Sequence, residues 1–143
     1  MEVEGYDFPD ELYFHCDHTW IRLEEDGRVR VGMNDFFQQT AGDIVYVDVP
    51  FEDDELEQGE TCGKVQSAKW VGKLVAPVSG TVLEVNEELD GESTLINSDP
   101  YGDGWVMLIE PEDWEEEKDE LMTGDAVREW LMGEIEKAKR GGQ

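Results

Sequence analysis

Twelve residues near the middle of the chain read Gly63-Lys64-Val65-Gln66-Ser67-Ala68-Lys69-Trp70-Val71-Gly72-Lys73-Leu74. Apolar residues alternate with polar ones on both sides of Lys69, which predicts two strands joined by a turn near that lysine. The stretch contains no acidic residue, although 37 of the 143 residues of the chain are acidic. A lysine at the turn of a hairpin stands clear of the body of the protein, where a modifying enzyme can reach it. On composition alone, however, a charged turn that keeps an edge strand soluble is the better explanation.

Short strands are predicted along the rest of the middle of the chain. Residues 25–27, Glu-Asp-Gly, separate two apolar runs and are typical of a hairpin turn. A single helical turn is expected at residues 35–39. The strands are expected at residues 20–23, 29–31, 44–49, 62–67, 71–76, 81–85 and 105–109. Many short strands at this spacing predict a mainly β fold, a sandwich or barrel of antiparallel sheets.

A weak internal repeat links the two halves of this pattern. The sequence Gly-Asp-Ile-Val-Tyr-Val at residues 42–47 matches Gly-Thr-Val-Leu-Glu-Val at residues 80–85. An acidic loop with a further glycine, Gly59 or Gly91, follows each copy. A half-length repeat of strands predicts two similar sheets related by a pseudo-twofold axis.

The spacing of apolar residues changes to a helical period near the C-terminus. From Asp125 onward, one helical face collects Ala126, Val127, Trp130, Leu131, Ile135 and Ala138. We therefore expect residues 1–143 to form a single domain, with a core at about 12–110 and a C-terminal helical segment at about 112–140. This helix is expected to pack on the sandwich.

The charge of the chain is strongly negative, with 37 acidic and 11 basic residues and a formal net charge of −26. Such a surface repels nucleic acids and anionic membranes, so neither is expected as a partner. A solvated acidic surface suited to high salt and an acidic face for one basic partner both explain the charge, and they are compatible. The N-terminal residues 1–5 are acidic and no run approaches the length of a membrane span, so we expect a cytoplasmic protein.

The two cysteines, Cys16 and Cys62, form neither a Cys-x-x-Cys motif nor a zinc spacing. In a cytoplasmic protein they are expected to be separate thiols, with Cys62 as a small packing residue. The sequence His15-Cys16-Asp17-His18 has metal-ligand types, but neighbours in a strand point to opposite faces. We therefore expect no metal site, and no pair of nucleophile and base suggests a catalytic site either.

Several blocks of the sequence resemble the glycine cleavage system H protein family in order and spacing. They are residues 18–22 (HTWIR), 31–36 (VGMNDF), 41–47 (AGDIVYV), 76–80 (APVSG) and 96–105 (INSDPYGDGW), and the resemblance covers about residues 12–135. The resemblance implies a single lipoyl-carrier domain with an antiparallel sandwich. It also implies lipoic acid as the cofactor, held as a covalent lipoyl-lysine on Lys69 rather than on Lys64 or Lys73. The carried chemistry belongs to the cofactor, so the resemblance implies a carrier without its own active site.

The chain departs from the family pattern beside the lysine. Gln66 replaces the usual glutamate, and residues 70–73 (Trp-Val-Gly-Lys) replace small and acidic residues. The N-terminal segment is longer and more aromatic. These features are similar to H-protein-like lipoate-binding proteins that work with heterodisulfide-reductase-like complexes in sulfur oxidation, and they favour that hypothesis narrowly.

Two further hypotheses stay open. The chain can be a glycine cleavage H protein that carries an aminomethyl group, or an unmodified β-sandwich interaction domain that has lost the cofactor. For either carrier, the resemblance implies a lipoate-attaching enzyme and a dihydrolipoamide dehydrogenase as partners. The remaining partner is then the heterodisulfide-reductase-like complex or the glycine cleavage enzymes.

Overall fold

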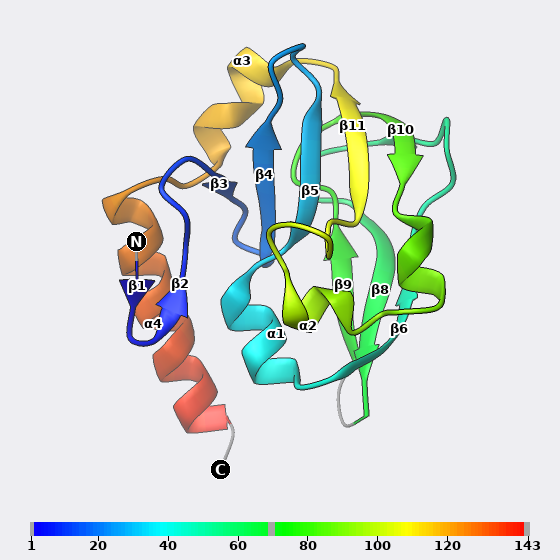
Figure 1. Cartoon of the computed structure of the whole chain (residues 1–143). Helices are drawn as coiled ribbons and strands as arrows, with labels where there is room; N and C mark the ends of the chain where they lie inside the picture. Colours follow the sequence, from blue (N-terminus) through cyan, green and yellow to red (C-terminus); the bar gives the residue numbers. More distant parts are fainter. Residues whose placement is uncertain (1, 69–70, 142–143) are drawn as a thin grey trace.

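Two antiparallel β-sheets face each other in the computed structural model, which describes residues 2–68 and 71–141 (Figure 1). The larger sheet has six strands in the order β3-β4-β5-β11-β10-β7, and the smaller sheet has three in the order β6-β8-β9. The larger sheet consists of β3 (Tyr13–Phe14), β4 (Thr19–Leu23), β5 (Val29–Met33), β11 (Met107–Pro111), β10 (Gly80–Val85) and β7 (Glu55–Leu56). The smaller sheet consists of β6 (Ile44–Asp48), β8 (Thr61–Ser67) and β9 (Val71–Val75).

The main core lies between the two sheets. Val31 and Ile109 of the larger sheet belong to one buried cluster with Val65 and Leu74 of the smaller sheet. On β8 the neighbours of Val65, Lys64 and Gln66, are more exposed, as the alternation of a half-buried strand requires. The predicted mainly β sandwich of antiparallel sheets is confirmed. The two copies of the internal repeat form β6 and β10, which lie in different sheets, as expected for two related halves.

Helices connect the strands at several points. Helix α1 begins after Asn34, whose side chain accepts a hydrogen bond from the Phe37 N–H (2.8 Å), and it ends at Gly42 with φ of 81°. The single turn expected from the sequence is therefore a helix of seven residues. The helices are α1 (Asp35–Ala41), α2 (Leu95–Ser98), α3 (Trp114–Glu117) and α4 (Asp125–Gly141), with 3-10 turns η1 (Glu87–Asp90) and η2 (Lys118–Glu120).

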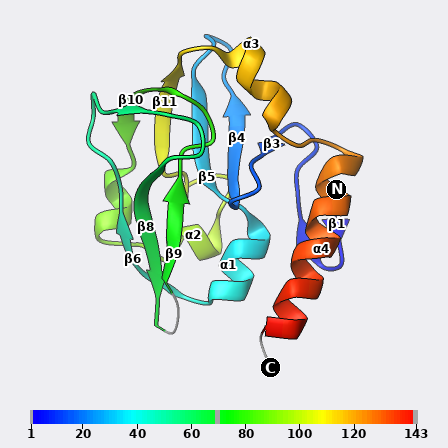
Figure 2. The same ribbon diagram turned by 180° about the vertical axis from the view of Figure 1, so that it is seen from behind.

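The N-terminal segment and α4 together form a second hydrophobic cluster. A short hairpin of β1 (Glu2–Val3) and β2 (Tyr6–Asp7) runs beside α4, as both views show (Figures 1 and 2). Val3 and Phe8 pack there with Val127 and Leu131 of α4. The predicted C-terminal helix is confirmed, and its partners include the aromatic N-terminal segment as well as the sandwich.

Asn97 in α2 fixes the start of the smaller sheet. Its side-chain oxygen accepts a hydrogen bond from the Ile44 N–H, and its amide nitrogen donates to the Gly42 carbonyl, both at 2.8 Å. The side chain therefore satisfies the backbone at the entry to β6, where a strand neighbour is missing.

The residues that follow α2 are bonded to the larger sheet and to the N-terminal segment. The Trp20 indole N–H donates to the Pro100 carbonyl (2.9 Å), and the Arg22 guanidinium donates to the Tyr101 carbonyl (2.6 Å). The Tyr101 hydroxyl donates to the Asp7 carbonyl at 2.7 Å. Burial raises the pKa of Tyr101, so this phenol stays a donor.

Some elements were not expected from the sequence, namely β1, β2, β3, β7 and α2. The last strand also begins later than predicted, at Met107 rather than at Trp105. The Trp105 ring instead lies under the Arg30 guanidinium, 4.5 Å from ring centroid to cation. No helix within the described residues is long and apolar enough to cross a bilayer.

Gly80 gives a test of the packing between β10 and its neighbour. A Cβ at this position would overlap the Glu110 carbonyl oxygen and press on Ile109. We expect Gly80→Ala to lower the free energy of unfolding by about 1–3 kcal/mol in urea denaturation, because the paired strands must move apart.

Gly133 in α4 is the matched control, because a Cβ there meets no atom within 4 Å. Gly133→Ala should leave stability unchanged or raise it by up to about 1 kcal/mol through helix propensity. Equal stability of Gly80→Ala and the wild type would show that the strands adapt to the methyl group.

Candidate functional site

The β8–β9 hairpin carries the lysine-rich stretch. Its register pairs Lys64 with Lys73, Val65 with Gly72, and Gln66 with Val71. Strand β8 ends and β9 begins at the end of the smaller sheet that lies away from α3 and the β4–β5 turn (Figures 1 and 2). Lys69, the predicted attachment residue, and Trp70 lie outside the described residues, so the position of Lys69 at the turn stays a prediction.

A cavity of about 220 Å³ lies beside β9. A second cavity of about 230 Å³ lies between α1 and α4. The first is lined by Asp17, His18, Phe37, Val71, Gly72, Lys73 and Val75, and the second by His18, Phe36, Phe37, Thr40, Glu134, Lys137 and Ala138. His18 and Phe37 line both cavities. The first cavity runs along β9 as far as Val71, the first residue of that strand.

His18 is held by aromatic rings and one carboxylate. Its Nε2 lies 3.1 Å from Glu134 Oε1, and its ring stacks on Phe36 with centroids 5.7 Å apart. The backbone of His18 has φ of 75°, a left-handed conformation that few L residues adopt. Burial lowers the pKa of His18, and the carboxylates of Glu134 and Asp17 partly oppose that shift. Near neutral pH the imidazole is therefore favoured in its uncharged form.

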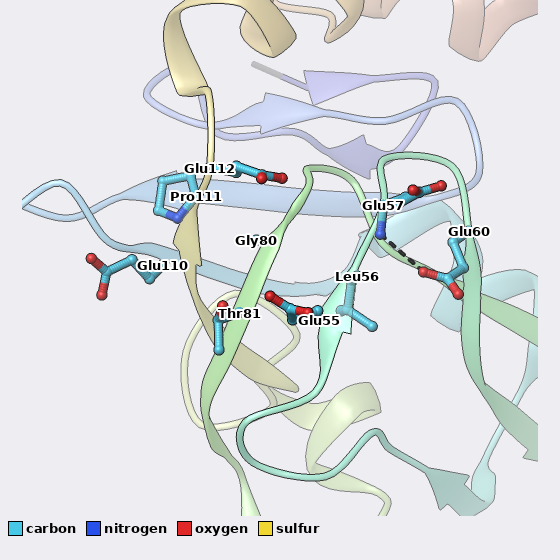
Figure 3. A pocket seen from close by; sticks show the side chains of 9 residues that line it. All are labelled: Glu55, Leu56, Glu57, Glu60, Gly80, Thr81, Glu110, Pro111 and Glu112. Atoms are coloured by element: carbon cyan, nitrogen blue, oxygen red, sulfur yellow. Dashed lines mark hydrogen bonds between the residues drawn. The ribbon is translucent and has the colours of Figure 1, made fainter.

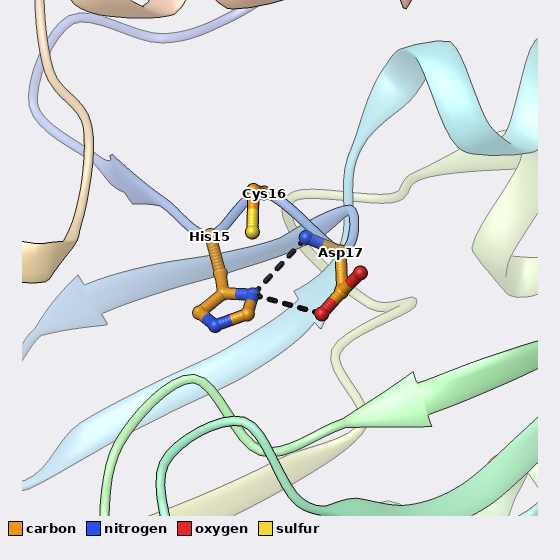
Figure 4. A group of neighbouring side chains, drawn as sticks. All are labelled: His15, Cys16 and Asp17. Atoms are coloured by element: carbon orange, nitrogen blue, oxygen red, sulfur yellow. Dashed lines mark hydrogen bonds and ion pairs between the residues drawn. The ribbon is translucent and has the colours of Figure 1, made fainter.

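His15, Cys16 and Asp17 place three potential metal ligands within 4.8 Å of one another (Figure 4). The His15 Nδ1 already accepts a hydrogen bond from the Asp17 N–H at 3.0 Å. Burial, and then the charge of Asp17, raise the pKa of the Cys16 thiol. A protonated thiol beside an engaged imidazole nitrogen is a poor ligand set for a cation.

A larger, acidic hollow of about 720 Å³ lies between β7, β10 and β11 (Figure 3). Its lining includes Glu55, Glu57, Glu60, Glu110 and Glu112. The Glu57 N–H donates to the Glu60 carboxylate at 2.9 Å, which fixes the loop between β7 and β8. The lining offers carboxylates and contains no histidine, lysine or cysteine, so we interpret the hollow as part of the solvated acidic surface.

The family model described as glycine cleavage H-protein matches residues 12–134, most of the chain. The chain belongs to this family.

Relatives named as glycine cleavage system H proteins match most of the chain. The glycine cleavage system H protein of Halalkalibacterium halodurans is 44% identical over 126 residues, 88% of this chain and 97% of its own length. The probable glycine cleavage system H protein of Pyrococcus horikoshii is 43% identical over 131 residues, 92% of this chain and 97% of its own length. The crystal structure of an H protein from Mycobacterium marinum has a TM-score of 0.76 and 33% identity, and it covers 95% of this chain and 100% of its own.

These matches bear on the choice of pathway made from the sequence. The relatives are named as glycine cleavage H proteins, so the comparisons favour that assignment over the sulfur-oxidation assignment. On the sequence alone, Gln66 and residues 70–73 narrowly favour the hypothesis of a sulfur-oxidation carrier. Substitutions at a few positions beside the lysine weigh less than a match to residues 12–134.

The structure adds residues to the site that sequence reasoning missed. His18 lies in the family block at residues 18–22. Phe36 and Phe37 lie in the expected helical turn, and Glu134 lies in the expected C-terminal helix. The sequence gives none of these residues a role in the site. The contact of Glu134 with His18 joins two segments more than a hundred residues apart, so no local pattern signals it.

The two thiols give a test of the passive role expected for them. Cys62 packs against the core and its Sγ lies 3.4 Å from the Leu74 carbonyl oxygen; burial raises its pKa to about 12. At pH 8 we expect a chromogenic disulfide reagent to titrate one thiol, the exposed Cys16, in the folded protein and both thiols in denaturant. The Cys16→Ser variant should show no reaction until it unfolds. Rapid labelling of Cys62 in folded Cys16→Ser would contradict its inert role.

Proposed function

We propose that this chain is a lipoyl carrier, the H protein of a glycine cleavage system, with the lipoyl group in amide linkage to Lys69. The observation that carries the proposal is the family match over residues 12–134, within which β8 and β9 pair in register on either side of Lys69. Members of this family carry a lipoyl group and work with the glycine cleavage enzymes. On this proposal, residues 1–143 act as one carrier domain in the cytoplasm.

The described surroundings of the hairpin fit an aliphatic cofactor arm. Strand β8 ends and β9 begins at one end of the smaller sheet, and Val71, the first residue of β9, is 57% exposed. The cavity along β9 has apolar walls from Phe37, Val71 and Val75, of a kind that an aliphatic chain can contact. Bound lipoic acid would supply a strained cyclic disulfide that can accept a group together with two electrons. Loss of the group leaves a dithiol, and reoxidation of the dithiol to the disulfide passes the electrons on.

The residues of the chain then hold and present the arm. An anchored arm has a high effective concentration at whichever enzyme docks on the hairpin, so the protein needs reach rather than a catalytic group. His18, favoured in its uncharged form, borders the cavity between the apolar side chains and the charged groups of Asp17 and Lys73. We propose that the chain has no active site of its own.

Three kinds of partner follow from this function. A lipoate-attaching enzyme modifies Lys69, glycine decarboxylase loads the arm with the aminomethyl group, and dihydrolipoamide dehydrogenase takes the electrons afterwards. The second candidate function, a lipoate-binding protein for a heterodisulfide-reductase-like complex, rests on Gln66 and on residues 70–73.

Lys69→Arg tests the attachment site. Co-expression of the wild type with a lipoate ligase should add one lipoyl mass in intact-protein mass spectrometry. Lys69→Arg should abolish the addition, because arginine keeps the charge but lacks a nucleophilic amine. Lys64→Arg and Lys73→Arg are the matched controls and should be modified as the wild type is. Modification that persists in Lys69→Arg would move the site, and no modification of the wild type by any ligase would favour the bare interaction domain.

Loading by glycine decarboxylase tests the pathway. With glycine present, the enzyme should release carbon dioxide and transfer the aminomethyl group to the lipoylated protein, and the unlipoylated Lys69→Arg variant should support neither. The rate should approach that obtained with the H protein of a characterised relative. Full lipoylation without loading would contradict the glycine cleavage assignment and restore the sulfur-oxidation candidate.

A further inference from the structure

The outer face of the three-stranded sheet combines exposed apolar residues with two lysines. Val65 and Gly72 are cross-strand partners and both are buried, so the next pairs along the strands point away from the core. One outward row is Tyr46, Gln66 and Val71, and the next is Asp48, Lys64 and Lys73. We call these six residues the outer face.

The outer face exposes apolar side chains although the chain as a whole is highly charged. Tyr46 is 48% exposed and Val71 is 57% exposed, and Val45, at the bulge of β6, is 56% exposed. The Lys64 ammonium lies 5.9 Å from the centroid of the Tyr46 ring, a cation–π contact that joins the apolar and basic parts. Exposed aromatic and aliphatic residues beside cations are typical of a binding surface rather than of a solvated face.

The charges of the outer face differ from those elsewhere in the chain. Arg28, Arg30, Lys118 and Lys137 each form an ion pair with a carboxylate of the same molecule. Among residues 2–68 and 71–141, no ion pair of this kind includes Lys64 or Lys73. In a chain with 37 acidic residues, this surface leaves two ammonium groups available to carboxylates of another molecule.

The register makes the arrangement costly in the isolated chain. Lys64 and Lys73 are direct cross-strand partners on the same face, and like charges in such a pair repel. Asp48 of β6 lies opposite Lys64 on its other side and offsets part of that repulsion, but Lys73 lies on the edge strand β9 with no carboxylate opposite it among the described strands. A partner that brings carboxylates to this point turns the repulsive pair into a favourable contact.

We propose that the outer face docks glycine decarboxylase, through a surface of that enzyme that sets carboxylates beside an apolar recess. The proposal rests on the proposed function, because an enzyme that receives an arm from Lys69 must cover the end of the β8–β9 hairpin. Lys73 and Val71 lie within four residues of Lys69 in the sequence. The acidic hollow between β7, β10 and β11 lies at the opposite end of the sheets and stays outside this interface (Figures 1 and 3).

The test compares two double charge reversals in the fully lipoylated protein. With glycine decarboxylase, we expect Lys64→Glu with Lys73→Glu to raise the KM for the carrier about tenfold and to change kcat less than about twofold. Arg28→Glu with Lys118→Glu changes the net charge equally at the other end of the molecule and should change KM less than about twofold. Lys64→Arg with Lys73→Arg should keep the KM of the wild type.

The single variant Lys73→Glu separates docking from folding. It places an acidic residue opposite Lys64, so the thermal unfolding midpoint should rise while the KM also rises. A defect caused by loss of structure would instead lower the midpoint. Tyr46→Ala, which removes the exposed ring, should also raise KM. Intact-protein mass spectrometry should show the same degree of lipoylation as in the wild type.

Several results would overturn the proposal. Equal KM values for both double reversals would show a general effect of net charge, and an unchanged KM for Lys64→Glu with Lys73→Glu would remove the lysines from the interface. A dimer of the wild type in analytical ultracentrifugation that Lys73→Glu dissociates would assign the outer face to a second copy. Failure of the lipoylated wild type to be loaded would contradict the proposed function itself, whereas loading of the wild type with unaffected variants would contradict only the docking surface.

Discussion

The amide of Asn97 is the contact that fixes how the smaller sheet sits in this molecule. It accepts from the Ile44 N–H and donates to the Gly42 carbonyl, so β6 begins where α2 allows. Because β8 pairs with β6 and β9 with β8, the placement of β6 is passed through the sheet to the hairpin. The segment after α2 is itself bonded to Trp20 and Arg22 of the larger sheet. The connection through α2 thus positions both sheets relative to each other, and leaving the half-buried Asn97 amide without its partners would cost more free energy than its hydrogen bonds contribute.

The two ends of the sandwich differ in the charge of the side chains that they expose. The acidic hollow at β7, β10 and β11 has no basic residue in its lining, whereas β8 and β9 carry the lysines of the outer face. Repulsion among carboxylates at one end does not act strongly at the other, because charges further apart than about 10 Å are screened at moderate ionic strength. A chain of net charge −26 can therefore present a locally different surface beside its hairpin.

Much of this fold was predictable from period and turn chemistry, and the rest depended on contacts between distant segments. The β4–β5 hairpin follows from alternation around Gly27, and α4 from its helical spacing. In contrast, β7 is two residues long and is defined by its pairing with β10, so it has no pattern of its own. The site divides in the same way. Composition alone favoured an ordinary charged turn at Lys69, and the family resemblance supplied its role. His18 became visible as part of the site only when α4 brought Glu134 beside it.

The shared cluster of the two chain ends has a consequence for the order of synthesis. Val3 and Phe8 pack in one cluster with Val127 and Leu131, which leave the ribosome much later than the N-terminal segment does. The sandwich strands, which end at Pro111, emerge earlier and can pair while α4 is still in the exit tunnel. During that interval the N-terminal aromatic residues have no helix to cover them. These N-terminal residues are thus made before the sandwich strands but find their packing partners after them, and their apolar surface stays open to chaperones until α4 has emerged.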